Sequence, residues 1–449
     1  MSRWRAVAPG RVNLIGEHTD YNGLPVLPIA IDRAIRIEFR VTGDAAVRLH
    51  SPVERFAPFA FRMRRPIEAA DRGDWSNYVR AAARGLLEHG IDLRRGIEGT
   101  VSGDVPVAAG LSSSSALVVA SALALLKANG VGVEDGTGGG AGGGAGRAPD
   151  EDPADKRPPA KTVSRLELAA LMARAERFAG LRGGGMDQAA CLHGVEGHAL
   201  RIEFEPLRVT PVAVPEGWRW VVASSLERAE KSAGARDAYN ERARQCREAL
   251  RGVGSGYRDL VAEPGLDGVL RRARGVLAPA LFRRFRHVVT EGRRVALAEE
   301  AMLNGELGRF GELMVQSHAS LRDDYEVSTA GLDEIVEIAL EAGAAGARLT
   351  GAGFGGCAVA LCEERAAATV MEALATRFYA PRLGGPPGRD AMFAAKASGG
   401  AGVTAAPPPP SPPLSAVPAL PSPSTAPAPA ARSRGTGNRP ATDPTRDWF

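Results

Sequence analysis

The chain has 449 residues, of which 44% are hydrophobic and 24% charged, with a formal net charge of +4. That length suffices for two domains with cores of their own, and the arginines are scattered rather than gathered in a dense basic run typical of nucleic-acid binding. The N-terminus lacks an apolar leader and no stretch of about 18 apolar residues predicts a membrane span, so we expect a cytoplasmic protein without nucleic-acid or membrane partners.

The first polar cluster stands in APGRVNLIGEHTDYN at 8–22, ahead of an apolar run. Arg11, Glu17, His18 and Asp20 lie within a dozen residues of one another. Carboxylates accept hydrogen bonds from hydroxyl groups and imidazole can donate or accept, so this cluster suits the binding of a small polyol. The alternative is a turn whose charged side chains face water, since clustered charges are usually solvated.

Hydrophobic patterning predicts strands and helices that are mixed along the chain. The predicted strands are 29–41, 46–50 and 218–223, and residues 348–362 predict a strand, a glycine loop and a second strand. The predicted helices are 75–88, 117–128, 166–179, 236–251, 282–298 and 332–342. Mixed elements in this order predict an α+β or α/β chain of two domains.

The loop before the helix at 117–128 belongs to the stretch GDVPVAAGLSSSSALVVA at 103–120. The first N–H groups of a helix have no internal partner and the helix dipole is positive there, so an anion is stabilised at this end. Glycine at 110 lets the backbone approach a phosphate, and serine hydroxyls add donors or a magnesium ligand. The alternative is a serine that only caps the helix, but one serine suffices for that and the chain has four in a row.

Three other nucleotide-binding patterns are excluded. The sequence contains neither the P-loop pattern nor the catalytic motifs of protein kinases. GAGFGG at 351–356 satisfies the dinucleotide-binding glycine pattern, but strand-like residues follow it where that pattern requires a helix.

Two segments have a composition that cannot form a hydrophobic core. Residues 132–161 form a glycine-rich insertion that continues into charged and proline-rich chain, and 398–449 form a Pro/Ala-rich tail. Ordering glycine at this density costs too much conformational entropy, so we expect a flexible surface insertion and a disordered tail. The four cysteines show no metal spacing, and the apolar surroundings of Cys357 and Cys362 predict buried free thiols.

Two further carboxylates are candidates for chemistry. Asp187 follows a glycine run in GGGMDQ at 183–188, where an aspartate is often only a turn former. Glu176 stands near the end of the predicted helix at 166–179, where a solvated carboxylate is the alternative.

Three of these motifs together resemble those of the galactokinases, in the GHMP group of small-molecule kinases. The matching segments are GRVNLIGEHTDYN at 10–22, the serine loop at 103–120 and LTGAGFGGC at 349–357, and the resemblance runs from about Val7 to Ala395. It implies a two-domain α+β fold. The N-terminal domain at 1–205 would resemble ribosomal protein S5 domain 2, the C-terminal domain at 206–397 would be ferredoxin-like, and the tail would follow.

The resemblance also implies the site residues. Asp187 would be the catalytic base and Arg11 would stabilise charge beside the reacting phosphate. The sugar would be held by Glu17, His18, Asp20, Gly184 and Tyr239. ATP would lie on Gly110, Leu111, Ser112, Ser113, Ser114 and Ser115, with magnesium bound by Ser115 and Glu176. The segment 317–328 would support the active site from below, and the loop at 349–357 would fold back near the phosphates.

The resemblance therefore predicts an ATP- and magnesium-dependent kinase, a monomer, that phosphorylates the anomeric hydroxyl of galactose. The four serines and the three glycines before Met186 are closer to the N-acetylgalactosamine kinases, so that substrate is the first alternative. A non-catalytic protein that senses sugar and ATP is the second.

Overall fold

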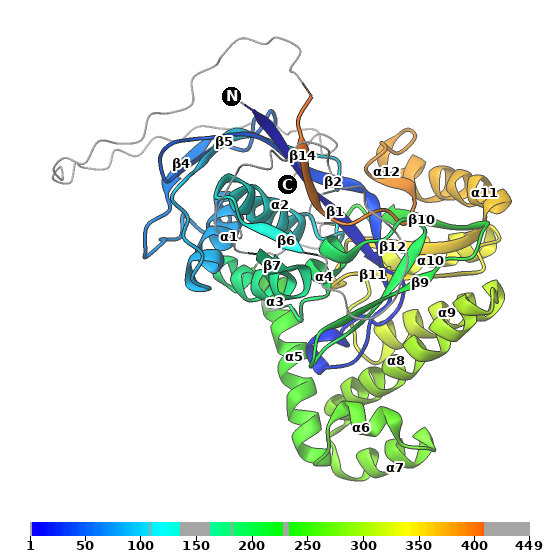
Figure 1. The fold of residues 1–449 in the computed structure, drawn as a ribbon. Helices are drawn as coiled ribbons and strands as arrows, with labels where there is room; N and C mark the ends of the chain where they lie inside the picture. The colour runs from blue at the N-terminus through cyan, green and yellow to red at the C-terminus, as the bar shows by residue number, and fades with distance from the viewer. Residues whose placement is uncertain (1, 107–108, 135–161, 181–182, 228–232, 408–449) are drawn as a thin grey trace, which may run out of the picture.

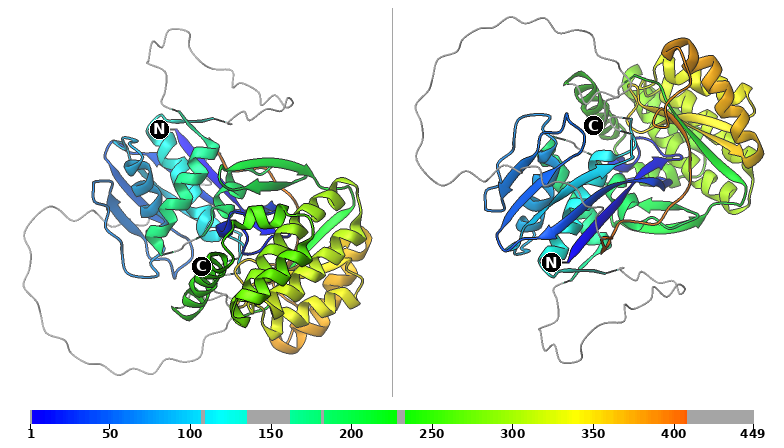
Figure 2. Two further views of the ribbon diagram at one scale, coloured as in Figure 1. Left: turned by 90° about the horizontal axis from the view of Figure 1, so that it is seen from below. Right: turned by 90° about the horizontal axis from the view of Figure 1, so that it is seen from above.

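The computed structural model describes residues 2–106, 109–134, 162–180, 183–227 and 233–407. Two sheets, each packed against helices, lie side by side, and a layer of helices (α5 to α9) extends from the second sheet below the first (Figures 1 and 2). Apart from 132–134, which form the short strand β6, the predicted glycine-rich insertion lies outside the described residues.

The N-terminal sheet has six strands in the order β14-β1-β2-β5-β3-β4. Its strands are β1 (Arg3–Asn13), β2 (Pro28–Val41), β3 (Ala46–His50), β4 (Phe59–Arg62), β5 (Ile97–Gly103) and β14 (Gly402–Ala405). The helices beside it are α1 (Ser76–Glu88), α2 (Ser113–Ala128), α3 (Arg165–Ala175) and α4 (Met186–His193). Helix α2 packs on β1 and β2 and is apolar and buried along nearly its whole length, which explains why its sequence shows no amphipathic face.

Strand β14 corrects the predicted start of the tail. Residues 402–405 pair antiparallel with Trp4 to Val7 of β1, so 398–407 belong to the fold and the tail prediction at 398 is wrong for them. The pairing uses backbone groups, which glycine and alanine supply as well as any residue, so composition alone did not predict it. The rest of the predicted tail, 408–449, lies outside the described residues.

The C-terminal sheet has four antiparallel strands in the order β11-β12-β10-β13. They are β10 (Trp218–Ser224), β11 (Gly346–Thr350), β12 (Cys357–Glu363) and β13 (Met392–Ala395), with α10 (Ala330–Glu341) and α11 (Glu364–Leu374) packed on them. Along the chain, helices lie between β10 and β11, and α11 lies between β12 and β13. The domain therefore has the β-α-β-β-α-β order of the predicted ferredoxin-like domain.

The remaining elements join and extend these two parts. They are η1 (Asp20–Asn22), β6 (Gly132–Glu134), β7 (Thr162–Ser164), η2 (Glu176–Ala179), β8 (His198–Glu203), β9 (Arg208–Ala213), α5 (Ala233–Val253), α6 (Tyr257–Ala262), α7 (Leu266–Val276), α8 (Pro279–Leu303), α9 (Leu307–Asp323), η3 (Ala375–Tyr379) and α12 (Ala380–Leu383). The hairpin of β8 and β9 spans the predicted domain boundary at residue 205.

Every helix and strand predicted from the patterning is present; β3 has the predicted ends, and the ends of the others are shifted. Helix α2 begins at Ser113 rather than 117, because the serines form its first turn. The predicted helix at 166–179 divides into α3 and the 3-10 turn η2. All four cysteines are free and buried, as predicted for Cys357 and Cys362.

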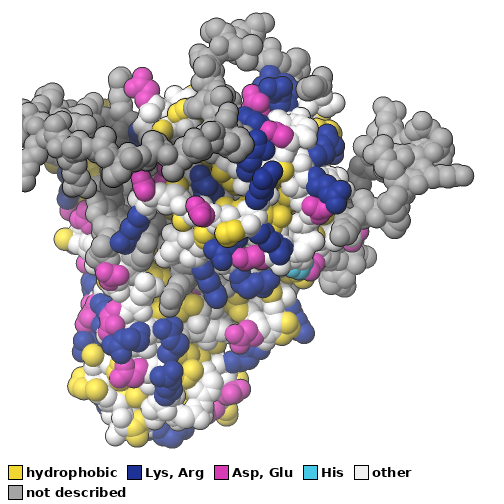
Figure 3. Space-filling model, turned by 90° about the vertical axis from the view of Figure 1, so that its left-hand side faces the viewer, with side chains coloured by type: hydrophobic (Ala, Val, Ile, Leu, Met, Phe, Trp, Pro, Cys, Tyr) yellow, Lys and Arg dark blue, Asp and Glu magenta, His cyan; other side chains and the backbone are white. Residues whose placement is uncertain are grey.

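On the face drawn in Figure 3, basic and acidic side chains are interspersed among the described residues. Within the described ranges, no helix combines the length and apolar character that a membrane crossing requires.

Helix α9 crosses strand β11 at a point where neither has a side chain. A Cβ added at Gly311 would stand 2.0 Å from the carbonyl oxygen of Ala345, and one at Gly346 would stand 2.3 Å from that of Gly311. Backbone atoms cannot yield as a flexible side chain can, so this contact requires glycine. The crossing fixes β11, which leads directly into the glycine loop at 351–356.

We therefore expect Gly311→Ala to lower the free energy of unfolding by about 1–3 kcal/mol, because the added methyl overpacks the crossing. Gly308→Ala is the control on the same helix, at an exposed position where an added Cβ meets nothing within 4 Å. It should be neutral or stabilise by up to about 1 kcal/mol, since alanine has the higher helix propensity. Urea unfolding checks both, and equal stabilities for the two variants would contradict the close crossing.

Candidate active site

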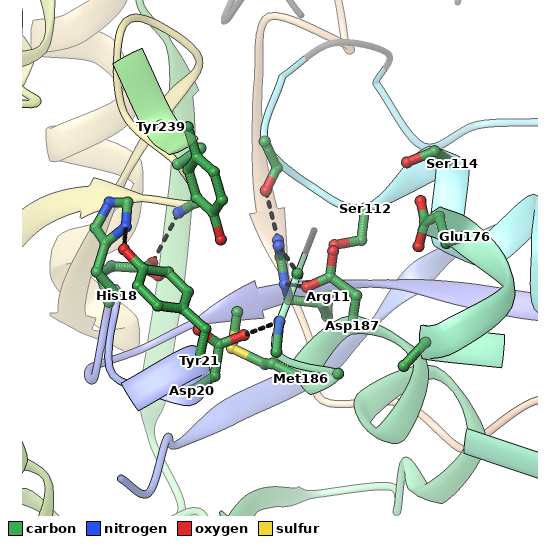
Figure 4. A pocket seen from close by; sticks show the side chains of 18 of the residues that line it. Arg11, His18, Asp20, Tyr21, Ser112, Ser114, Glu176, Met186, Asp187 and Tyr239 are labelled. Atoms are coloured by element: carbon green, nitrogen blue, oxygen red, sulfur yellow. Dashed lines mark hydrogen bonds and ion pairs between the residues drawn. The ribbon is translucent and has the colours of Figure 1, made fainter. Parts of the chain in front are cut away.

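A cavity of about 190 Å³ lies where the two halves of the chain meet. Its lining comes from β1, the loop before η1, the start of α2, η2, the start of α4, helix α5 and the loop between β11 and β12. Figure 4 shows its two sides. On the phosphate side stand Ser112, Ser114 and Glu176, on the polyol side His18, Asp20, Tyr21 and Tyr239, and between them Arg11 and Asp187.

Arg11 and Asp187 form an ion pair at the centre of the cavity. The Arg11 Nε donates to Asp187 Oδ1 at 2.8 Å and its Nη2 lies 2.7 Å from the same oxygen. The guanidinium also donates through Nη1 to the carbonyl oxygen of Gly110. Burial alone would lower the pKa of Arg11, but the carboxylates of Asp187 and Glu17 raise it above its ordinary value. Arg11 is therefore a fixed positive charge that orients Asp187.

The phosphate side is built on the start of α2. Ser112 lies just before the helix with φ 63°, a left-handed conformation that is uncommon outside glycine. Ser112, Ser113 and Ser114 line the cavity together with Gly110 and Leu111. The exposed N–H groups and positive dipole end of a helix that faces a cavity stabilise an anion there. The predicted phosphate-binding residues are thus gathered at one side of the cavity.

Ser115 and Glu176 meet immediately behind that serine turn. Ser115 Oγ donates to Glu176 Oε2 at 2.7 Å and lies 3.4 Å from Asp187 Oδ2. Gln188 also donates to Glu176 Oε2. Magnesium takes oxygen ligands, often one or two protein groups plus substrate phosphates, so a hydroxyl and a carboxylate beside a phosphate site suit it. Among the described residues no group of three His, Cys, Asp or Glu side chains could hold a metal on its own.

Two glycines bring the third motif against the phosphate loop. A Cβ at Gly351 would stand 2.9 Å from the carbonyl oxygen of Gly110, and both residues have positive φ. The predicted fold-back of the loop at 349–357 toward the phosphate loop is therefore present in the structure, and only backbone fits between the two loops.

On the polyol side, Asp20 is held by a glycine that nothing larger could replace. The N–H of Gly184 donates to Asp20 Oδ2 at 3.0 Å, and a Cβ at Gly184 would stand 2.5 Å from that oxygen. Burial, with the nearby charge of Asp187, raises the pKa of Asp20 to about 6 even though two backbone N–H groups oppose this shift. Asp20 is thus a largely desolvated carboxylate that lines the cavity.

His18 is oriented by a row of hydroxyl groups. Its Nδ1 lies 2.8 Å from Tyr21 Oη, which lies 2.8 Å from Tyr325 Oη, and Tyr325 Oη lies 3.0 Å from Cys246 Sγ. Burial and the neighbouring His287 lower the pKa of His18 to about 3, so its imidazole is neutral at physiological pH. A neutral ring offers one donor and one acceptor, which suits a hydroxyl.

Tyr239 and Glu17 complete the polyol side in different ways. The Tyr239 ring lies 5.6 Å from that of His18 and 5.5 Å from that of Tyr21, so α5 closes the cavity over them. Glu17 Oε1 accepts from the N–H of Gly351 at 2.7 Å and from Thr350 Oγ1 at 3.2 Å. Burial raises the pKa of Glu17, against the lowering effect of Arg348 and Arg11.

The structure thus places the predicted residues in one cavity, with Ser115 directly behind its wall. Sequence reasoning assigned no role to Tyr21 or to Thr350, although Tyr21 lies inside the N-terminal motif and Thr350 inside the third motif. Tyr325 lies in the segment 317–328 that was expected to support the site. Their hydrogen bonds join positions more than 300 residues apart, and no local pattern reports such contacts.

Family models match three parts of the chain. Residues 2–41 match the galactokinase galactose-binding signature, 77–137 the N-terminal domain of GHMP kinases and 298–380 the C-terminal domain of GHMP kinases. The galactokinase of Chloroflexus aggregans is 38% identical over 370 residues, which cover 80% of this chain and 83% of that protein.

Solved structures agree with these matches. The Lactococcus lactis galactokinase, solved in complex with galactose, has a TM-score of 0.74 and 30% identity, over 89% of this chain and 95% of that chain. The mevalonate kinase of Methanococcus jannaschii, at 18% identity and a TM-score of 0.54 over 88% of this chain and 98% of that chain, shares the fold.

The raised pKa of Asp20 predicts how its neutral analogue changes stability. A carboxyl whose folded-state pKa is about 6, against an ordinary 3.8, stabilises the fold fully below about pH 4 and loses that contribution as the pH rises through 6. Asn cannot ionise, so Asp20→Asn should gain about 1–3 kcal/mol relative to the unchanged chain between pH 4 and pH 7.5. Urea unfolding at the two pH values measures this, and a difference that does not change with pH would show that Asp20 titrates normally.

Proposed function

Because the chain belongs to the galactokinase family of GHMP kinases, we propose that it transfers the γ-phosphoryl group of ATP to the anomeric hydroxyl of galactose, which yields galactose 1-phosphate and ADP. The observation that carries this proposal is the Arg11–Asp187 ion pair, which lies between a group of polyol-binding side chains and the start of a helix that suits an anion. A phosphoryl transfer needs its acceptor and its donor in line, with a fixed charge where the two meet.

In this proposal galactose lies on the polyol side. Asp20 accepts hydrogen bonds from sugar hydroxyls, and Gly184, whose N–H donates to Asp20, contacts the sugar beside it. The neutral His18 and the carboxylate of Glu17 bind further hydroxyls, and Tyr239 packs against the sugar from α5. Buried polar groups that only the correct hydroxyl arrangement satisfies give such a site its selectivity.

ATP lies on the phosphate side. The backbone of Gly110 to Ser115 and the serine hydroxyls bind the phosphates at the positive end of α2. Ser115 and Glu176 are the residues that would hold magnesium, whose charge, when the ion is bound, offsets that of the phosphates. The contact of these two side chains behind the serine turn supports that assignment.

The chemical step then uses the central ion pair. The anomeric oxygen forms a bond to the γ-phosphorus, the bond from that phosphorus to the bridging oxygen of ADP breaks, and the hydroxyl proton passes to the Asp187 carboxylate. Arg11 holds the Asp187 carboxylate in place through their ion pair and offsets the charge on the moving phosphoryl group. Most of the rate gain comes from holding the two substrates in line, since phosphoryl transfer needs little covalent help.

The substrate assignment is tested by measuring ATP consumption with galactose, N-acetylgalactosamine, arabinose and mevalonate in parallel. We expect the highest kcat/KM with galactose. A higher value with N-acetylgalactosamine would replace galactose by the alternative suggested by the four serines. Turnover of none of the four would leave the non-catalytic sensor as the better reading.

The base assignment is tested by Asp187→Asn. Asparagine keeps the shape but cannot take a proton, so we expect kcat to fall by about a hundredfold or more while galactose binding is largely kept. Asp104→Asn, which removes an Asp–Arg pair with Arg36 outside the cavity, is the matched control and should leave kcat unchanged. Near-normal turnover by Asp187→Asn would remove Asp187 from the mechanism.

A further inference from the structure

Helix α8 holds the loop that carries Glu17 and His18 through a fully buried carboxylate. Glu291 Oε1 accepts from the backbone N–H of Gly16 at 2.9 Å and from that of Glu17 at 3.3 Å. The hydroxyl of Ser317 on α9 donates to the same oxygen at 2.7 Å. Arg294 Nε donates to the other carboxylate oxygen at 2.8 Å. Glu291 thus binds the two loop amides, while Ser317 and Arg294 hold its carboxylate in place.

The same helix holds the loop a second time, one turn earlier. His287 Nε2 lies 3.1 Å from the carbonyl oxygen of Glu17, and its Nδ1 lies 2.9 Å from Ser320 Oγ. A carbonyl oxygen only accepts, so the ring proton is on Nε2 and Nδ1 accepts from the serine. Burial lowers the pKa of His287 to about 4, which keeps the ring in this neutral form. Both backbone groups of Glu17 are therefore bound by α8.

The loop needs such support because its backbone is strained. His18 has φ 63°, a left-handed conformation that is uncommon for a residue with a side chain and persists only where neighbours enforce it. Gly16 has φ +99°, and a Cβ there would stand 2.8 Å from Val295 of α8. The loop therefore lies directly on the helix that binds it.

Charge links Glu291 to Glu17 as well. The guanidinium of Arg348, fully buried on β11, lies 3.6 Å from Glu17 Oε1 and 3.9 Å from Glu291 Oε1. Burial alone would raise the pKa of Glu291, but Arg294 and Arg348 hold it at about 2. Glu291 is thus a permanent negative charge that shares one cation with a residue of the polyol side.

We propose that Glu291 is a positioning residue for sugar binding: it holds the backbone of Gly16 and Glu17 and so sets where the Glu17 and His18 side chains stand in the cavity. This role rests on the proposed function only in that the bound molecule is galactose. Arg11 and Asp187 come from β1 and α4, which Glu291 does not contact. Its loss should therefore weaken sugar binding far more than it slows the chemical step.

The test compares Glu291→Gln with Glu299→Gln. Glu299 lies on the same helix and pairs with Arg201 of β8, away from the loop, so it controls for loss of a buried or partly buried ion pair on α8. We expect Glu291→Gln to raise the KM for galactose at least about tenfold while kcat and the KM for ATP stay within about threefold. Glu299→Gln should leave all three constants unchanged. An unchanged galactose KM in folded Glu291→Gln, or an equal rise in Glu299→Gln, would overturn the proposal.

Hydrogen exchange gives a readout that does not depend on the substrate. The amides of Gly16 and Glu17 donate to Glu291 Oε1. Glutamine keeps an acceptor oxygen but loses the negative charge, and its NH2 group would face the Arg294 donor, so it holds the two amides less firmly. The peptide that contains them should therefore exchange faster in Glu291→Gln and at the unchanged rate in Glu299→Gln. Unchanged exchange in Glu291→Gln would overturn the loop contact even if galactose proved not to be the substrate. Conversely, faster exchange in a protein that does not phosphorylate galactose would support the contact of Glu291 with the loop and contradict the proposed function.

Glu291→Asp decides the matter if Glu291→Gln does not fold. Aspartate keeps the negative charge that balances Arg294 and Arg348, so the buried charges remain paired, but its shorter side chain withdraws the carboxylate from the two amides. We expect folded Glu291→Asp to show both the raised galactose KM and the faster exchange of the loop. If both stayed at the values of the unchanged chain, Glu291 would be a structural ion-pair partner and nothing more.

Discussion

The arrangement of the cavity depends on one buried cation. The Arg11 side chain is 5% exposed and binds Asp187 at the start of α4 and the carbonyl of Gly110 before α2. It therefore joins β1, the phosphate loop and the helix that carries the carboxylate. A buried guanidinium must keep such partners, because an uncompensated buried charge costs about 3–5 kcal/mol. The same requirement that stabilises the fold at this point also fixes the distance from Asp187 to the phosphate loop.

Close backbone contacts determine how the rest of the cavity is placed around that pair. Gly184 leaves room only for its hydrogen bond to Asp20, and Gly351 packs against Gly110. Farther away, the glycine contact of α9 with β11 sets the strand that ends at the loop of Gly351. These positions transmit geometry through backbone atoms, which are stiffer than side chains. The backbone contacts of these glycines thus hold the polyol side and the phosphate side in position relative to each other.

The sequence alone was enough to single out the candidate site residues that lie inside compact motifs. Arg11, Asp20, Gly110 and Asp187 each lie within a short motif that resembles one of the galactokinases, and the structure brings all four to one cavity. The supports could not be predicted, because Glu291 lies in an ordinary helical pattern and meets Gly16 from 275 positions away. Strand β14 was missed for a related reason, since glycine and alanine carry little side-chain signal while their backbone groups pair with β1. Prediction from sequence therefore identified side chains that line the cavity and missed the long-range contacts that hold them in place.

The central claim is that Arg11 and Asp187 act as one unit. A double-mutant cycle on kcat/KM for galactose with Arg11→Gln, Asp187→Asn and the double variant tests it directly. If Arg11 works through Asp187 and through the same phosphoryl group, the losses overlap, and the double variant should be about as slow as the slower single variant. Losses that multiply in full would mean that the two residues act independently, and the ion pair would then be a structural contact rather than the centre of the mechanism.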